Sequence, residues 1–129
     1  MSRIIIDTSA YSAFMRGDKK VRSVLQTSEA IFLNPVVIGE LMSGFISGKR
    51  ASHNREELDI FLSSPRVRTI SIDQETSDRY AAIVYTLRTQ GTPLPTNDIW
   101  IAASAMQYGL KILTLDDHYL NIPQVIVIN

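Results

Sequence analysis

The chain has 129 residues, of which 45% are hydrophobic and 20% are charged, a balance typical of a folded globular protein and not of a disordered one. Its 13 basic and 13 acidic residues cancel, and the absence of cysteine excludes a disulfide framework, a thiolate metal site and a cysteine nucleophile. The N-terminal sequence lacks the apolar core of a signal peptide, and no apolar run reaches the length of a membrane span. We expect a single domain over residues 1–129, located in the cytoplasm.

The first half of the chain alternates short apolar strands with helices. Residues 3–7 form a β-branched run typical of a central strand in a parallel sheet. Thr8 and Ser9 are suitable caps for the helix that follows, and Asn34 before Pro35 predicts another helix start. The elements expected here are a strand at 3–7, helices at 8–15 and 18–27, a strand at 31–33, a helix from 35 to about 48, and a helix at 53–63.

The second half continues the alternation. Asp73 predicts the cap of a long helix that Gly91 terminates. Residues 99–106 are apolar almost all round, which indicates a buried helix. The elements expected are a strand at 67–72, helices at 73–90 and 97–108, and strands at 111–115 and 125–128. This order predicts an α/β fold: a three-layer α/β/α sandwich with a mainly parallel central sheet.

Four acids occupy ends of these elements: Asp7, Glu40, Asp98 and Asp116. In an open α/β sheet the carboxyl ends of the strands meet at one crevice, and we expect the four side chains to face it. Capping or a surface location explains each acid taken alone, since helix starts favour negative charge. Four acids that face the same crevice favour a functional site there. Asp117 adjoins Asp116 and is the alternative ligand at that position.

Gathered carboxylates repel, and a pair about 4 Å apart costs roughly 4 kcal/mol at an effective dielectric near 20. The arrangement therefore needs protons or a cation. Oxygen ligands suit Mg²⁺ or Mn²⁺, and a site that keeps open water positions suits phosphodiester cleavage. A carboxylate not fully engaged by metal is then available to orient the attacking water.

Charge and spacing bear on the alternatives. Setting the four acids aside leaves 13 positive charges against 9 negative ones, with basic residues gathered at 16–22 and 49–55. Such runs are common at solvated helix ends and also suit a phosphate backbone, so binding to nucleic acid stays open. A haloacid-dehalogenase-type phosphatase needs a second Asp where Ser9 stands, and the lysine of a response-regulator receiver is not visible.

The sequence resembles the PIN-domain family, and more narrowly the VapC-type toxins of toxin–antitoxin pairs. The resemblance covers nearly the whole chain, and its most specific piece is Asn97-Asp98-x-x-Ile101-Ala102-Ala103. Tyr119 departs mildly from the Phe that is usual after the last motif. The matching segments are residues 4–10, 37–41, 97–105 and 113–119.

The resemblance implies a Mg²⁺- or Mn²⁺-dependent endoribonuclease that uses the four acids, with Asp7 and Asp98 as the firmest metal ligands. It places the hydroxyls of Ser9 and Thr114 beside those ligands, although local capping explains them equally well. It also implies a homodimer and a cognate VapB-type antitoxin, which would lie in an apolar groove near the first helices and send an arginine to the acids. Candidates for that groove are Tyr11, Phe14, Met42, Phe45 and Phe61, and a place in the core is the alternative for most of them.

Two other functions stay open, namely a structure-specific DNA nuclease and a binding module that contacts RNA or protein without cleaving it. We expect the dimer interface on helix 73–90 or on the helix that carries Asp98, because apolar residues such as Tyr85 exceed the needs of one core. Trp100 is expected to be a packing residue. His53 and His118 are expected at the surface, without a role as general base.

Overall fold

The computed structural model describes residues 2–129, which form one five-stranded sheet in the order β3-β2-β1-β4-β5. All four neighbouring strand pairs are parallel, as predicted. The central strand β1 contributes Ile4, Ile5 and Ile6, none of which is exposed. The strands are β1 (Arg3–Ile6), β2 (Ala30–Leu33), β3 (Val67–Thr69), β4 (Lys111–Leu113) and β5 (Val127–Ile128).

Four strands are shorter than predicted. β1 ends at Ile6 and not at residue 7, because Asp7 is the N-cap of α1. β3 ends at Thr69 and not at residue 72, because its neighbour β2 ends at Leu33; the Leu33 carbonyl still accepts the N–H of Ile70, and residues 71–72 have no strand to pair with. β4 ends at Leu113 and not at residue 115, because the N–H groups of Leu115 and Asp116 donate to the hydroxyls of Ser9 and Thr114 and not to a neighbouring strand. β5 covers only Val127–Ile128 and not 125–128, since its neighbour β4 is short.

The helices begin and end close to the predicted residues. Asp7, Asn34 and Asp73 each accept a backbone N–H as N-cap, and Gly91 ends its helix in the left-handed region at φ 73°. One helix begins at Ala51 and not at residue 53, and a 3₁₀ turn after β4 was not predicted. The helices are α1 (Thr8–Met15), α2 (Lys19–Thr27), α3 (Pro35–Ser47), α4 (Ala51–Leu62), α5 (Gln74–Gln90), α6 (Thr96–Tyr108) and η1 (Asp117–Asn121).

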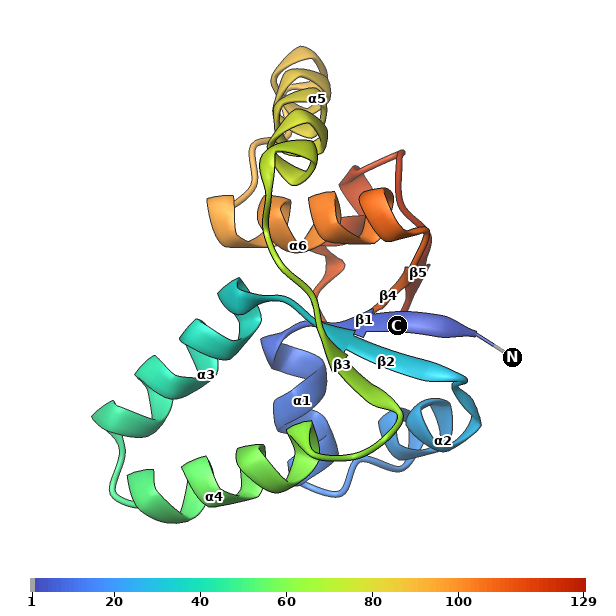
Figure 1. Cartoon of the computed structure of the whole chain (residues 1–129). Helices are drawn as coiled ribbons and strands as arrows, with labels where there is room; N and C mark the ends of the chain where they lie inside the picture. Colours follow the sequence, from blue (N-terminus) through green and yellow to red (C-terminus); the bar gives the residue numbers. More distant parts are fainter. Residues whose placement is uncertain (1) are drawn as a thin grey trace.

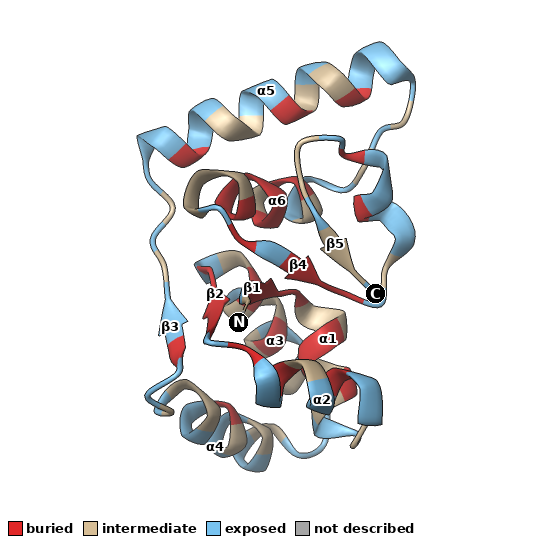
Figure 2. Ribbon diagram, turned by 90° about the vertical axis from the view of Figure 1, so that its right-hand side faces the viewer, coloured by how far each residue is buried: buried red, intermediate tan, exposed pale blue. Residues whose placement is uncertain are grey.

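The helices cover both faces of the sheet. Figure 1 shows α6 on one face with α5 outside it, and α1 to α4 on the other side. Helix α6 is therefore enclosed, which explains its buried run from Ile101 to Ala105 (Figure 2). Trp100 of α6 stacks on Tyr80 of α5 at a centroid distance of 4.0 Å, the packing role expected for it. Within the described residues, none of the helices is long and apolar enough to cross a membrane.

Candidate active site

All four predicted acids line one hollow at the carboxyl ends of the strands. Asp7 follows β1 and Asp116 follows β4, its neighbour in the sheet, while Glu40 comes from α3 and Asp98 from the first turn of α6. The hollow has a volume of about 300 Å³. Its lining residues are Asp7, Thr8, Ser9, Ser12, Glu40, Asp98, Ile101, Asp116 and Tyr119.

Asp7 is held by three hydrogen bonds. Its Oδ1 accepts from the backbone N–H of Ala10 at 2.9 Å and from Ser9 Oγ at 2.7 Å, and its Oδ2 accepts from Thr114 Oγ1 at 2.5 Å. Burial raises the pKa of Asp7, the three hydrogen bonds lower it, and the charge of Asp116 raises it. The raised pKa means that an ionised carboxylate at this position destabilises the folded protein. Ser9 and Thr114, the two predicted hydroxyls, therefore both act directly on Asp7.

Asp116 is oriented by the turn that follows β4. Its backbone N–H donates to Thr114 Oγ1 at 2.9 Å, and its Oδ1 accepts from the backbone N–H of His118 at 2.9 Å, which caps η1. Asp117 is exposed, does not line the hollow and accepts a hydrogen bond from Asn129 Nδ2 at 3.2 Å. The geometry thus favours Asp116 over Asp117 as the site residue.

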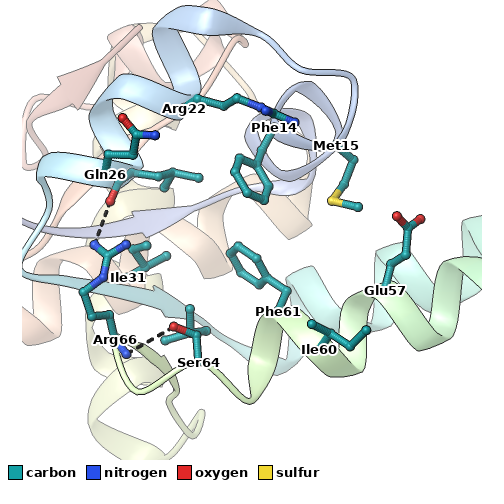
Figure 3. Close-up of a pocket in the computed structure, with 12 residues that line it drawn as sticks. Phe14, Met15, Arg22, Gln26, Ile31, Glu57, Ile60, Phe61, Ser64 and Arg66 are labelled. Carbon is teal, nitrogen blue, oxygen red and sulfur yellow. Dashed lines mark hydrogen bonds between the residues drawn. The ribbon is translucent and has the colours of Figure 1, made fainter.

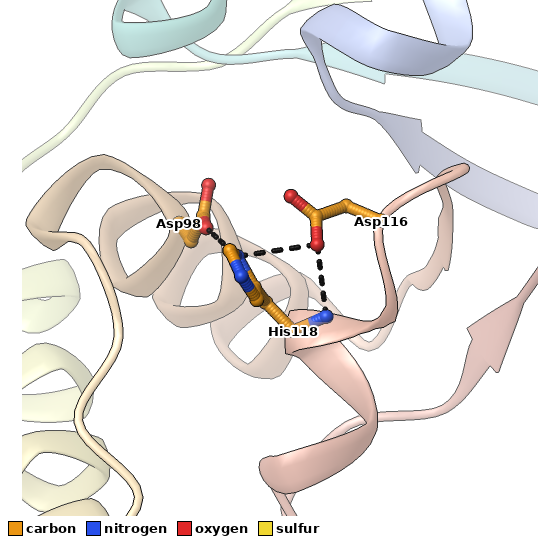
Figure 4. A group of neighbouring side chains, drawn as sticks. All are labelled: Asp98, Asp116 and His118. Atoms are coloured by element: carbon orange, nitrogen blue, oxygen red, sulfur yellow. Dashed lines mark hydrogen bonds and ion pairs between the residues drawn. The ribbon is translucent and has the colours of Figure 1, made fainter.

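Both oxygens of Asp98 contact residues of η1, and Figure 4 shows the contact with His118. Tyr119 donates its hydroxyl to Oδ1 at 3.3 Å, and His118 Nδ1 lies 3.2 Å from Oδ2 and 3.1 Å from Asp116 Oδ1. Burial raises the pKa of Asp98, the His118 contact lowers it and the charge of Asp116 raises it. Tyr119 is fully buried, and its burial, together with the nearby carboxylates, raises its pKa, so it remains a donor.

Sequence reasoning missed two of these contacts. The His118 side chain is half exposed, as expected, yet its ring joins two site carboxylates. Its position two residues after Asp116 was the available signal. Tyr119 was considered only as a departure from the family pattern.

Glu40 occupies a different part of the hollow. Thr8 Oγ1 donates to its Oε1 at 2.8 Å, and Asn97 Nδ2 donates to its Oε2 at 3.1 Å. Both donors are neutral, so they orient the Glu40 carboxylate without neutralising its negative charge. These roles of Thr8 and Asn97 were also not anticipated, because Thr8 was considered only as a helix cap.

The donor set fits a divalent cation. No Lys or Arg is found among the lining residues that the structure describes, and the four carboxylates there need a positive partner. Donor atoms of Asp98, Asp116 and His118 all lie within 4.8 Å of one another, the only described group of three that is this close. Asp7 and Glu40 line the same hollow without joining that group.

The candidates for the apolar groove line several cavities beside α4. Phe14 and Phe61 line a cavity of about 580 Å³ between α1, α2 and α4 (Figure 3), with Tyr11 buried and packed edge-on against Phe61. Met42 and Phe45 line a separate cavity of about 530 Å³ between α3 and α4. Tyr11 and Phe45 also line a smaller cavity of about 180 Å³ between α1, α3 and α4. The five candidates therefore all lie around α4, and a groove for the antitoxin stays a prediction.

Comparison with known proteins agrees with this architecture. Ribonuclease VapC4 of Mycobacterium tuberculosis is 34% identical over 93 residues, 72% of each chain. Ribonuclease VapC of Rickettsia bellii is 27% identical over 128 residues, covering 97% of this chain and 94% of that protein. The structure of VapBC2 from Rickettsia felis, bound to a DNA fragment from their promoter, aligns with a TM-score of 0.85 at 23% identity over 98% of this chain and 97% of that one. The PIN domain family matches residues 4–124, and the chain belongs to that family.

Proposed function

We propose that this protein is a Mg²⁺- or Mn²⁺-dependent endoribonuclease that hydrolyses RNA phosphodiester bonds, and that it acts as the toxin of a toxin–antitoxin pair. The observation that carries the proposal is the hollow in which carboxylates from four separate segments meet without a Lys or Arg among its described lining residues. The relatives named as VapC ribonucleases support RNA as the substrate class.

The residues of the hollow divide the work. Asp7, Asp98 and Asp116, with Glu40, would hold the cation, which when bound supplies positive charge at the scissile phosphate and makes water more acidic. Ser9 and Thr114 keep Asp7 in one orientation through their hydrogen bonds. Glu40 is held by two neutral donors, which leaves its charge available to accept a proton from the attacking water.

The substrate and the partner have separate surfaces in this proposal. RNA enters at the acidic hollow. A VapB-type antitoxin occupies the apolar cavity of α1, α2 and α4, where Ile60 is 70% exposed and Phe14 and Phe61 form the floor (Figure 3). Solved VapBC complexes with the same fold support a partner of this kind.

We also propose a homodimer that uses α5. Most apolar residues of α6 are buried in the core of their own chain, whereas Tyr85 on α5 is 74% exposed. An exposed aromatic residue of this size favours α5 over α6 as the interface.

Cleavage by purified protein tests the enzymatic proposal. Asp7→Asn and Asp98→Asn should each reduce cleavage of RNA in Mg²⁺ at least about a hundredfold, because each removes a charge from the proposed cation site. Asp117→Asn is the matched control, since this neighbouring acid lies outside the hollow. Wild-type rates in both active-site variants would refute the mechanism.

The substrate class is tested in the same assay. RNA and DNA of matched sequence differ in the 2′-hydroxyl and in groove shape, and we expect cleavage of RNA alone. Cleavage of the DNA alone would favour a DNA nuclease. Cation binding without cleavage of either would favour a binding module.

A further inference from the structure

His118 has an unusual position for a half-exposed histidine. A single ring nitrogen, Nδ1, lies 3.2 Å from Asp98 Oδ2 and 3.1 Å from Asp116 Oδ1 (Figure 4). That nitrogen carries at most one hydrogen, so it cannot give a full hydrogen bond to both oxygens. Asp116 Oδ1 already accepts the backbone N–H of His118. A hydrogen bond alone is therefore a poor account of the convergence of these three donor atoms.

We propose that His118 Nδ1 is itself a ligand of the divalent ion, together with Asp98 and Asp116, and that the centre therefore prefers a transition-metal ion such as Mn²⁺ to Mg²⁺. This inference rests on the proposed metal-dependent function and deepens it. It assigns the histidine a ligand role and the site a choice of cation.

The spacing of the donor atoms agrees with a shared ion. Two ligands at right angles, each roughly 2.1 Å from one ion, are about 3.0 Å apart, and tetrahedral ligands at the same bond length are about 3.4 Å apart. The distances of 3.1 Å and 3.2 Å from Nδ1 to the two carboxylates fall between these values. Both distances from Nδ1 are thus compatible with a shared ion, and all three donor atoms lie within 4.8 Å of one another.

The surrounding hydrogen bonds hold the two carboxylates in this orientation. Tyr119 donates to Asp98 Oδ1, which leaves Oδ2 turned toward His118. The backbone N–H of Asp116 is fixed by Thr114 Oγ1. Such outer contacts commonly set ligand orientation in metal sites. The His118 ring, in contrast, is half exposed and is not needed to fill the core.

Ligand chemistry then predicts the selectivity. Mg²⁺ prefers oxygen ligands in a near-ideal octahedron and keeps several waters, so an imidazole nitrogen adds little to its binding. Transition ions accept imidazole readily. A His118 ligand should therefore increase affinity for Mn²⁺ much more than affinity for Mg²⁺, whereas a histidine that only positions the carboxylates should affect both ions equally.

The experiment is calorimetric titration of Mn²⁺ and of Mg²⁺ into tag-free protein, with His118→Ala, His118→Asn and the control His53→Ala. His53 is the other histidine and pairs with Glu57 on α4, away from the hollow. We expect His118→Ala to weaken Mn²⁺ binding at least about tenfold and Mg²⁺ binding by less than about threefold. Asn restores a hydrogen-bond donor near the ring position but not the imidazole nitrogen. If His118 is a ligand, His118→Asn should therefore bind Mn²⁺ as weakly as His118→Ala does.

Pulsed electron paramagnetic resonance of the Mn²⁺-bound protein gives a direct readout. The nitrogen coupling of a bound imidazole should appear in the wild type and in His53→Ala, and should be lost in His118→Ala. Equal weakening of both ions, with no nitrogen coupling in the wild type, would overturn the ligand role and leave the proposed function intact. A wild type that binds neither ion would overturn the proposed function together with the inference.

Discussion

Removal of one charge from the hollow should stabilise the protein when no metal is bound. The substitution is Asp98→Asn, which keeps the shape of the side chain and an oxygen that accepts from Tyr119. Burial and the charge of Asp116 raise the pKa of Asp98, so the ionised form is disfavoured in the folded state at neutral pH. An amide at this position removes that penalty.

The structure sets the size of the effect. Donor atoms of Asp98 and Asp116 lie within 4.8 Å of each other, a separation at which two unit charges repel by roughly 3.5 kcal/mol at an effective dielectric near 20. Asp116 is 36% exposed and His118 lies between the two acids, so solvent and the imidazole screen the repulsion. We therefore expect a gain of about 1–2 kcal/mol, which corresponds to about 4–8 °C in the unfolding midpoint of a chain of this size.

Thermal unfolding followed by circular dichroism at about pH 7.5 measures this, with chelator and then with saturating Mn²⁺. Asp98→Asn should unfold at a higher temperature than the wild type in chelator, and should gain much less from Mn²⁺. Asp117→Asn should match the wild type in both conditions, because its carboxylate lies outside the hollow. A lower midpoint for Asp98→Asn in chelator would show that the acids do not repel and that the electrostatic argument is wrong.

Four further outcomes are expected. The stability advantage of Asp98→Asn in chelator should shrink as the pH falls. The pKa of Asp98 is higher in the folded protein than in the unfolded chain, so the destabilising charge is lost as the pH falls through the folded pKa toward the unfolded one. A stability difference that does not change with pH would contradict this. Thr114→Val should cost about 1.5–3 kcal/mol in urea unfolding, since Thr114 donates to the Asp7 carboxylate, and unchanged stability would refute that role. Tyr85→Ser should shift a dimer toward monomer by light scattering, whereas a wild type that is already monomeric at micromolar concentration would exclude the dimer. Phe14→Asp should abolish capture of the proposed VapB-type antitoxin while Tyr85→Ser retains it, and binding by both would place the partner elsewhere.

Local patterns in the sequence determined most of the fold and which acids would come together in one hollow. The β-branched run before Asp7 predicts a central strand because a parallel strand is buried on both faces, and Asn34 and Asp73 predict helix starts because their side chains cap nearby backbone N–H groups. The first helix start was also predicted, but its cap is Asp7 and not Thr8 or Ser9. Once the strands are parallel, acids at their carboxyl ends must share one edge of the sheet. The four acids were therefore identifiable without coordinates, because both steps depend on short-range physics and one rule of topology.

The tertiary structure alone decided how the site residues meet. His118 reaches Asp98 across 20 residues of sequence, and Asn97 reaches Glu40 across 57. These contacts depend on the angle at which α3, α6 and η1 meet the sheet. Packing of the whole core sets that angle, and the periodicity and capping signals of the sequence do not predict it. The same reason applies to the apolar candidates near the first helices: they line several cavities around α4, and the packing of α4 is a property of the folded chain and not of its hydrophobic pattern.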